Sequence, residues 1–103
     1  MSLFMGIDIG TTFCKAVVCD QMGSVIYRTA RENIMNVSGV FAEEDPVLWW
    51  DNVCSMTREA VAAPAVRSGG KIEGVGISCA GAIMAVDTSG QPLTNAIMQM
   101  DKR

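Results

Sequence analysis

Short apolar runs separated by turn residues dominate the first third of the chain. The runs 3–9, 14–20 and 25–30 have the length and the β-branched content of strands, and glycine or aspartate lies close to their ends. Three strands joined by such short turns are expected to pair as an antiparallel meander. From 32 to 44 the pattern is mixed, and we expect a loop there.

A helix is predicted to follow this loop. Asp45 has a side chain suited to an N-cap, and Pro46 at the first helical position costs no hydrogen bond. One of the two adjacent tryptophans is expected in the core and the other on the surface, because neighbouring helix residues point about 100° apart. Apolar side chains at helical spacing predict a buried stripe made of Val47, Trp50, Val53 or Cys54, Thr57 and Val61.

The last third of the chain returns to strands. The helix is expected to end before Pro64 and the segment 67–71 to form a loop, followed by strands over 72–79 and 82–87. After a turn at Gly90, the final residues begin a further strand. Three antiparallel strands, a crossover helix and a returning strand give the order β-β-β-α-β. This order predicts an α/β fold with a mixed sheet of the ribonuclease H-like type.

The composition indicates an incomplete domain. Of the 103 residues, 50% are hydrophobic and only 18% are charged, against about 25% charged in an ordinary soluble domain. We expect more protein to cover the apolar surface, and the chain by itself to associate, with a homodimer as one form. The net charge of −3, without a basic patch, argues against a nucleic-acid partner. No apolar run has the length of a membrane-spanning helix.

The four cysteines and the absence of histidine limit the metal and catalytic chemistry. No two cysteines have C-x-x-C spacing, so a zinc cluster is not expected. Cys79 has no histidine to activate it, which favours a packed thiol over a nucleophile. Free thiols in a methionine-rich chain favour a reducing, cytoplasmic compartment. The start of the chain also lacks the basic region of a signal peptide.

The segment 8–12, with the sequence DIGTT, is the strongest candidate for ligand chemistry. Strand alternation points Asp8 away from the face that its apolar neighbours share, and Gly10 lets the backbone approach a ligand closely. The amides of 10–12 and the two threonine hydroxyls can converge on phosphate oxygens. Lys15 adds positive charge, and Asp8 can hold Mg²⁺ through water. An ordinary strand and turn explains the same residues about equally well.

Several segments together resemble the FGGY carbohydrate kinases, a family within the actin, hexokinase and heat-shock chaperone superfamily. The similar segments are, in chain order, GIDIGTTFCKAVVCDQMGSVI, EEDPVLWWDNV, IEGVGISCAGAIMAVDTSGQPLTNAI and MDKR. They span essentially the whole chain in the right order, which is more specific than any one short motif. The resemblance therefore favours a phosphate-binding turn over an ordinary hairpin.

The resemblance implies an ATP-dependent kinase that phosphorylates a hydroxyl of a sugar or polyol between two ribonuclease H-like domains of the actin/hexokinase type. Residues 1–103 would be the N-terminal portion of the first domain, with the rest of the kinase chain as their partner. The ATP phosphates would bind to Gly10, Thr11, Thr12 and Lys15, with Asp8 holding Mg²⁺ through water. The sugar would lie against Cys79, Ala80, Gly81 and Asp101.

The resemblance also implies that this chain lacks the catalytic residue. The general base of the family lies beyond residue 103, so we expect the chain to be inactive by itself. Where several members have Gln-Met-His or Gln-Arg-Glu, this chain has Cys79-Ala80-Gly81, so contacts to the sugar there would come largely from the backbone. The segment 98–100 replaces the usual tryptophan. The alternative is a non-enzymatic nucleotide-binding module or remnant of the same superfamily, against which the helix start and the 86–93 hairpin argue.

Overall fold

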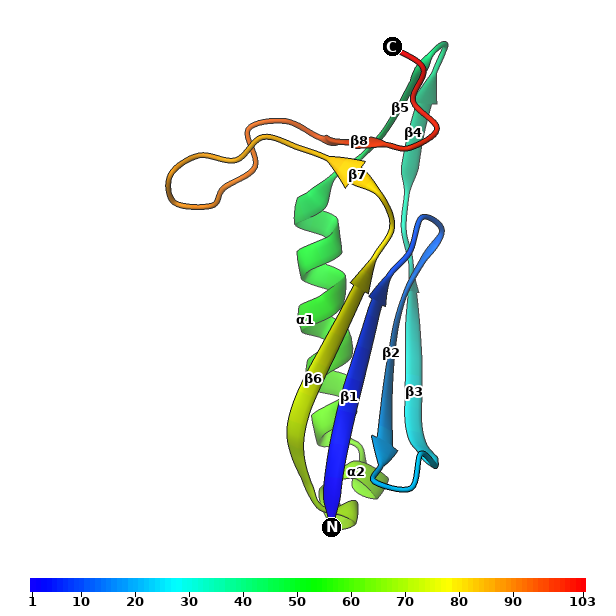
Figure 1. Ribbon diagram of the computed structural model, residues 1–103, viewed down its shortest axis with the longest axis vertical. Coiled ribbons are helices and arrows are strands. Elements are labelled where there is room, and N and C mark those ends of the chain that lie inside the picture. Colours follow the sequence, from blue (N-terminus) through cyan, green and yellow to red (C-terminus); the bar gives the residue numbers. More distant parts are fainter.

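Two four-stranded sheets, one beyond the other along the long axis, organise the molecule (Figure 1). The computed structural model describes residues 1–103. Sheet A has the strand order β3-β2-β1-β6, and sheet B has the order β4-β5-β8-β7. The elements in chain order are β1 (Ser2–Ile9), β2 (Phe13–Asp20), β3 (Val25–Glu32), β4 (Met35–Ser38), β5 (Phe41–Glu44), α1 (Pro46–Ala62), α2 (Pro64–Gly69), β6 (Lys71–Cys79), β7 (Ala82–Ile83) and β8 (Ala96–Met98).

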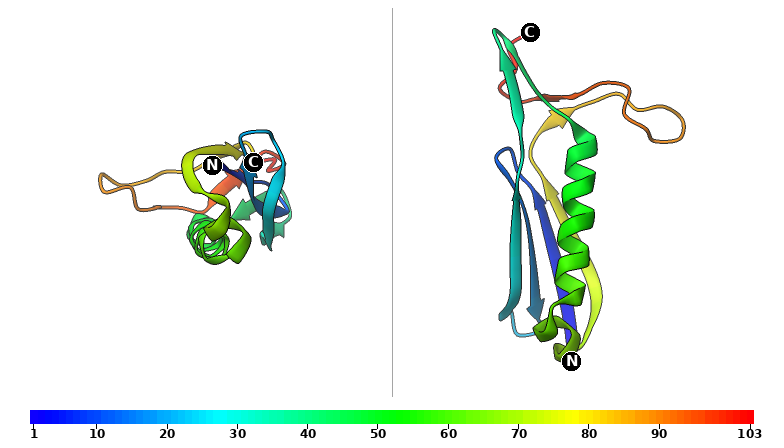
Figure 2. Two further views of the ribbon diagram at one scale, coloured as in Figure 1. Left: turned by 90° about the horizontal axis from the view of Figure 1, so that it is seen from below. Right: turned by 180° about the vertical axis from the view of Figure 1, so that it is seen from behind.

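Sheet A confirms the predicted meander and crossover. β1 pairs with β2 and β2 with β3 in antiparallel fashion, whereas β6 returns parallel to β1 after the helices. Helix α1 begins as predicted, with the Asp45 carboxylate accepting a hydrogen bond from the Val47 amide at 2.9 Å. It lies along one face of sheet A, and the opposite face carries no helix (Figure 2). The observed order is therefore β-β-β-α-β with one addition, the sheet B hairpin.

The core lies between sheet A and the helices. Alternate residues of β1 and β2 face α1, and small side chains on β2 leave room for the helix to approach. Full burial of one large apolar side chain stabilises the fold by roughly 1.5–3 kcal/mol. The ten buried residues of this core are Leu3, Met5, Ile7, Cys14, Ala16, Val18, Met56, Ala60, Ala63 and Val66.

The predicted buried stripe of α1 was right for Val53, which packs against the core, but wrong at three other positions. Val47, Trp50 and Val61 are exposed, whereas the face toward sheet A contains Met56 and Ala60. Apolar residues surround much of this helix, so spacing alone did not single out one stripe. The prediction for the two tryptophans is confirmed, because Trp49 is partly buried and Trp50 is 67% exposed.

The expected loop at 32–44 is instead the β4–β5 hairpin. Gly39 has a φ of 59° between the paired residues Ser38 and Phe41, and positive φ is what a two-residue hairpin turn demands. β8, far along the sequence, pairs with the other edge of β5. A partner so distant leaves no local signal, so sheet B was not foreseen.

Two smaller predictions also need correction. Residues 64–69 form a short helix where part of a loop was expected, because Pro64 starts a new helix and Val66 is buried beneath it. The predicted strand 82–87 shrinks to Ala82–Ile83, since β8 offers only a three-residue partner. The turn at Gly90 is confirmed by its φ of 85°.

Much apolar surface is exposed, as the composition predicts. Only 16 of 103 residues are buried, and the molecule measures 48 × 28 × 19 Å. Its radius of gyration of 15.7 Å exceeds the ~13 Å of a compact domain of 100 residues. Neither helix combines the length and the apolar character needed to cross a membrane.

A buried carboxyl group lies in sheet B. Ala42, Ala96 and Met98 form a small apolar cluster there, and Glu44, opposite Ala96, is only 1% exposed. Its Oε1 accepts a hydrogen bond from Trp49 Nε1 at 2.8 Å, whereas Oε2 has no partner. Burial raises the pKa of the Glu44 carboxyl above its usual value, with the Trp49 hydrogen bond opposing this shift. The fold therefore disfavours the ionised form.

We expect Glu44→Gln to stabilise the protein at neutral pH. The pKa of this carboxyl group is higher in the folded than in the unfolded protein, where it is about 4.3. The group therefore contributes fully to the free energy of unfolding below about pH 4.3, and this contribution is lost as the pH rises through the pKa of the folded state. The gain in free energy of unfolding should therefore be small near about pH 4 and increase toward about pH 7. Urea unfolding across this range measures it, with Glu73→Gln on the exposed part of β6 as control. A gain that does not change with pH would contradict the interpretation.

Candidate functional site

The turn between β1 and β2 consists of Gly10, Thr11 and Thr12. The Gly10 amide donates a hydrogen bond to the Phe13 carbonyl at 2.9 Å, which closes the turn. A Cβ atom added to Gly10 would lie 2.7 Å from that same carbonyl oxygen, closer than atoms can pack. Glycine is therefore required here because of close backbone approach.

Two amide groups of this turn are free to bind a ligand. Neither the Thr11 nor the Thr12 N–H donates to a backbone carbonyl, and the Thr12 side chain is exposed. Successive free N–H groups with neighbouring hydroxyls form a concave donor set that suits the oxygens of a phosphate. The turn thus has the chemistry of an anion site.

Asn33, which the sequence reasoning missed, holds this turn from behind. Its backbone N–H donates to the Thr12 carbonyl at 2.7 Å, and its side-chain Nδ2 donates to the Gly10 carbonyl at 2.6 Å. The residue is 8% exposed and directly follows β3 in the chain. A single asparagine in an expected loop carries no sequence signal for this contact.

Three polar residues lie side by side next to the turn, on the face of sheet A that lacks a helix. Asp8 is opposite Lys15 on β2 and opposite Ser78 on β6, and all three are exposed. They line an open hollow of about 480 Å³, and Gly6 and Gly76 are also among its lining residues. Strand alternation thus gives a carboxylate, an ammonium and a hydroxyl one common face.

The Asp8 carboxylate also lies beside the turn itself. Its Oδ2 is 3.9 Å from the position that a Gly10 Cβ would occupy. No three histidine, cysteine, aspartate or glutamate side chains gather in a way that could hold a metal ion. A lone carboxylate beside an anion site fits Mg²⁺, which keeps several waters and binds through one or two carboxylates together with phosphates.

The predicted sugar segment lies at the same end of sheet A as the turn. β1 and β6 are parallel neighbours, so their ends meet, and the Ala80 amide donates to the Ile9 carbonyl at 2.8 Å. Cys79 is exposed, and its thiol donates only to the adjacent Ala80 carbonyl at 3.3 Å. The side chain of Gln99 is close to Gly81, with Oε1 3.5 Å from where a Cβ would lie.

Asp101 belongs to a separate cluster next to β5 of sheet B. Its carboxylate accepts hydrogen bonds from the Ala42 amide at 2.7 Å and from the Arg103 guanidinium at 2.7 and 2.8 Å. Arg103 also pairs with Glu43 and stacks over the Phe41 ring at 4.6 Å. The Arg103 hydrogen bonds hold the pKa of the Asp101 carboxyl well below its usual value. Both oxygens already have partners, and contact of Asp101 with a sugar stays a prediction.

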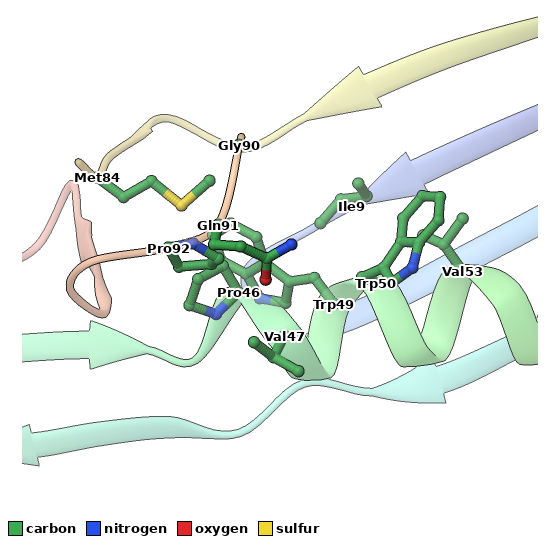
Figure 3. A pocket seen from close by; sticks show the side chains of 10 residues that line it. All are labelled: Ile9, Pro46, Val47, Trp49, Trp50, Val53, Met84, Gly90, Gln91 and Pro92. Atoms are coloured by element: carbon green, nitrogen blue, oxygen red, sulfur yellow. The ribbon is translucent and has the colours of Figure 1, made fainter. Parts of the chain in front are cut away.

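A second cavity, of about 420 Å³, lies on the helix side of the sheet (Figure 3). The start of α1 and the 84–92 segment form most of its walls. Its lining is mainly apolar and contains no charged side chain, so nothing in it would offset the charge of a phosphate. The lining residues are Ile9, Pro46, Val47, Trp49, Trp50, Val53, Met84, Gly90, Gln91 and Pro92.

Comparison with known proteins identifies the family of this chain. Residues 3–103 match the model of the FGGY family of carbohydrate kinases, N-terminal domain. The chain belongs to the FGGY family. The probable L-xylulose kinases of Pasteurella multocida and Haemophilus influenzae are 32% and 33% identical to this FGGY chain over its whole length. The chain spans only 22% and 21% of those two proteins, about a fifth of their length.

Solved structures confirm the actin/hexokinase-type fold expected from the sequence. The xylulose kinase from Rhodospirillum rubrum superimposes with a TM-score of 0.91 at 29% identity, over 98% of this FGGY chain and 21% of that protein. The gluconate kinase from Lactobacillus acidophilus gives a TM-score of 0.83 at 25% identity, over 97% of this chain and 20% of that protein. The second sheet is therefore part of a shared architecture.

We expect Gly10→Ala to disrupt the turn. Because the added Cβ would meet the Phe13 carbonyl at 2.7 Å, the backbone must move, at a cost of roughly 1–3 kcal/mol in the free energy of unfolding. Gly76→Ala is the matched control, since a Cβ added there meets nothing within 4 Å. Urea unfolding of both variants measures the costs. Equal costs at the two positions would show that the turn tolerates a side chain.

Proposed function

We propose that this chain forms the N-terminal portion of the first domain of a carbohydrate kinase, which transfers the terminal phosphoryl group of ATP to a hydroxyl of a sugar or polyol. The observation that carries this proposal is the turn at residues 10–12, with two free amides beside Asp8 and Lys15. Family membership supports the same conclusion. The names of the relatives, xylulose, glycerol and gluconate kinases, support a sugar or polyol as acceptor.

The turn would hold the phosphates of ATP. The amides and hydroxyls of Thr11 and Thr12 would donate to phosphate oxygens, and the Lys15 ammonium would offset their negative charge. Asp8 would hold the hydrated Mg²⁺ ion, which neutralises charge on the transferring phosphoryl group when bound. Phosphoryl transfer depends mainly on such positioning and charge stabilisation, so fixed donors on a rigid strand end suit it.

The acceptor would lie against the end of β6. The side chains of Cys79 and Ala80 offer little for hydroxyl groups to bind, so the backbone of 79–81 would supply most of the contacts there. This placement of the acceptor is supported by the parallel pairing of β1 and β6, whose ends meet next to the β1–β2 turn. An acceptor hydroxyl and a phosphoryl group could thus be held at the same end of the sheet.

The rest of the kinase chain would complete the site. Asp8 is the carboxylate beside the turn and is assigned to Mg²⁺, so the general base that deprotonates the acceptor would come from elsewhere in the kinase. The apolar residues exposed on this chain would pack against that remainder, or against a second copy when the chain is alone. Free cysteines are in keeping with a cytoplasmic enzyme.

We expect Lys15→Met to weaken the binding of Mg·ATP about tenfold, because one charge-assisted contact to phosphate is lost. The loss should shrink at high salt, since the Lys15 side chain is exposed and its charge is screened by ions. Lys71→Met, an exposed lysine at the opposite end of sheet A, is the matched control. Titration calorimetry measures both affinities. Equal affinities for the two variants would contradict the role of Lys15.

The chain alone should bind Mg·ATP without turning it over. It carries the turn for the phosphates, but the general base is expected outside it. A coupled assay of ADP release over a panel of sugars and polyols tests this. Sugar-dependent turnover by residues 1–103 would overturn the assignment of the base to another part of the kinase.

A further inference from the structure

We propose that Asn33 is a positioning residue for phosphate binding, which fixes the Gly10–Thr11 and Thr12–Phe13 peptide planes of the β1–β2 turn so that the Thr11 N–H faces the ligand. This inference rests on the proposed phosphate-binding function of that turn. Asn33 makes both of the contacts that hold the turn from behind, one with its backbone and one with its side chain. The rest of the turn is closed only by the bond from Gly10 to Phe13.

The geometry of the peptide bond connects these contacts to the ligand side. In a trans peptide, the carbonyl of one residue and the N–H of the next point in opposite directions, and no peptide bond in this chain is cis. Asn33 Nδ2 holds the Gly10 carbonyl at 2.6 Å, so the Thr11 N–H points away from Asn33. The bond from the Asn33 N–H to the Thr12 carbonyl orients the Phe13 N–H in the same way.

The Asn33 side chain is itself held in one orientation. Its Oδ1 accepts a hydrogen bond from the Cys14 thiol at 3.1 Å and from Asn52 Nδ2 at 3.3 Å. Two donors on the Oδ1 side and one carbonyl on the Nδ2 side allow only one placement of the amide. Because the residue is 8% exposed, water does not readily replace these partners. The amide is thus a fixed support and not a flexible surface group.

Asn33 also links the turn to the rest of the fold. It lies between β3 of sheet A and β4 of sheet B, and Asn52 connects it to α1. Its side chain thus connects the turn, β2 and α1 through Gly10, Cys14 and Asn52. Rigid support of this kind lowers the cost of ordering the turn when a ligand binds.

The substitution Asn33→Asp tests the proposal with little change in shape. An ionised aspartate has no donor for the Gly10 carbonyl, whereas a protonated one can donate its O–H. At about pH 7.5 the variant should bind inorganic tripolyphosphate with Mg²⁺ about tenfold more weakly than the wild type. Burial raises the pKa of the introduced carboxyl, so a larger fraction is protonated at about pH 5 and the ratio of the two affinities should be smaller there than at about pH 7.5. A residue with a purely structural role would give no such change in the ratio.

Asn36→Asp provides the matched control, because Asn36 is exposed on β4 and the same charge is introduced. Its affinity should equal that of the wild type within about twofold at both pH values. If the wild type binds tripolyphosphate and Asn33→Asp binds equally well at about pH 7.5, the inference about Asn33 is wrong and the phosphate turn stands. If the wild type itself does not bind, the proposed function of the turn fails, and the inference fails with it.

A measurement on the wild type covers the case in which Asn33→Asp does not fold. The side-chain amide protons of Asn33 should exchange with solvent at least about tenfold more slowly than those of exposed Asn36. Saturation with Mg²⁺ and tripolyphosphate should slow the exchange of Asn33 further, because the ligand and Asn33 both hold the Gly10–Thr11 peptide plane. Unchanged exchange at Asn33, while the ligand binds, would overturn the proposal.

Discussion

The whole site depends on the way in which two carbonyl groups of one short turn are held. Asn33 binds the Gly10 and Thr12 carbonyls from the interior, so the Thr11 and Phe13 N–H groups of the same two peptide planes point to the opposite side. A turn with unsatisfied donors is unfavourable unless those donors meet water or a ligand. The two hydrogen bonds from Asn33 hold the carbonyl side of the turn, and the Thr11 and Thr12 amides make no hydrogen bond to a backbone carbonyl.

The order of the strands brings the remaining groups to the same place. β1 is central in sheet A, with the antiparallel β2 on one side and the parallel β6 on the other. The end of β1 therefore adjoins both the β1–β2 turn and the segment that follows β6. Alternation along the strands sends apolar residues to α1 and places Asp8, Lys15 and Ser78 on the face without a helix. The alternation of side chains thus puts the core on one face of sheet A and the polar residues on the other. The chain that does so spans about a fifth of the length of its relatives.

The elements whose signals are local could be predicted from the sequence. The three meander strands, the Asp45 cap and the Gly10 turn each depend on neighbouring residues, and each was found. The phase of α1 and the second sheet depend on partners distant in the sequence: Met56 is buried because β2 lies beneath it, and β5 is a strand because β8 pairs with it. Asn33 was missed for the same reason. Its role follows from hydrogen bonds to residues on other elements, which no spacing or composition reveals.

The most direct test of this account is a backbone amide NMR titration of the wild-type chain with inorganic tripolyphosphate and Mg²⁺. The account predicts that the amide signals of Thr11 and Thr12 move most, because these groups are free and face the ligand. The signals of the distant turns at Gly23 and Gly39 should not move. Binding with the largest changes away from residues 10–12, or no binding at all, would contradict the assignment of this turn as a phosphate site.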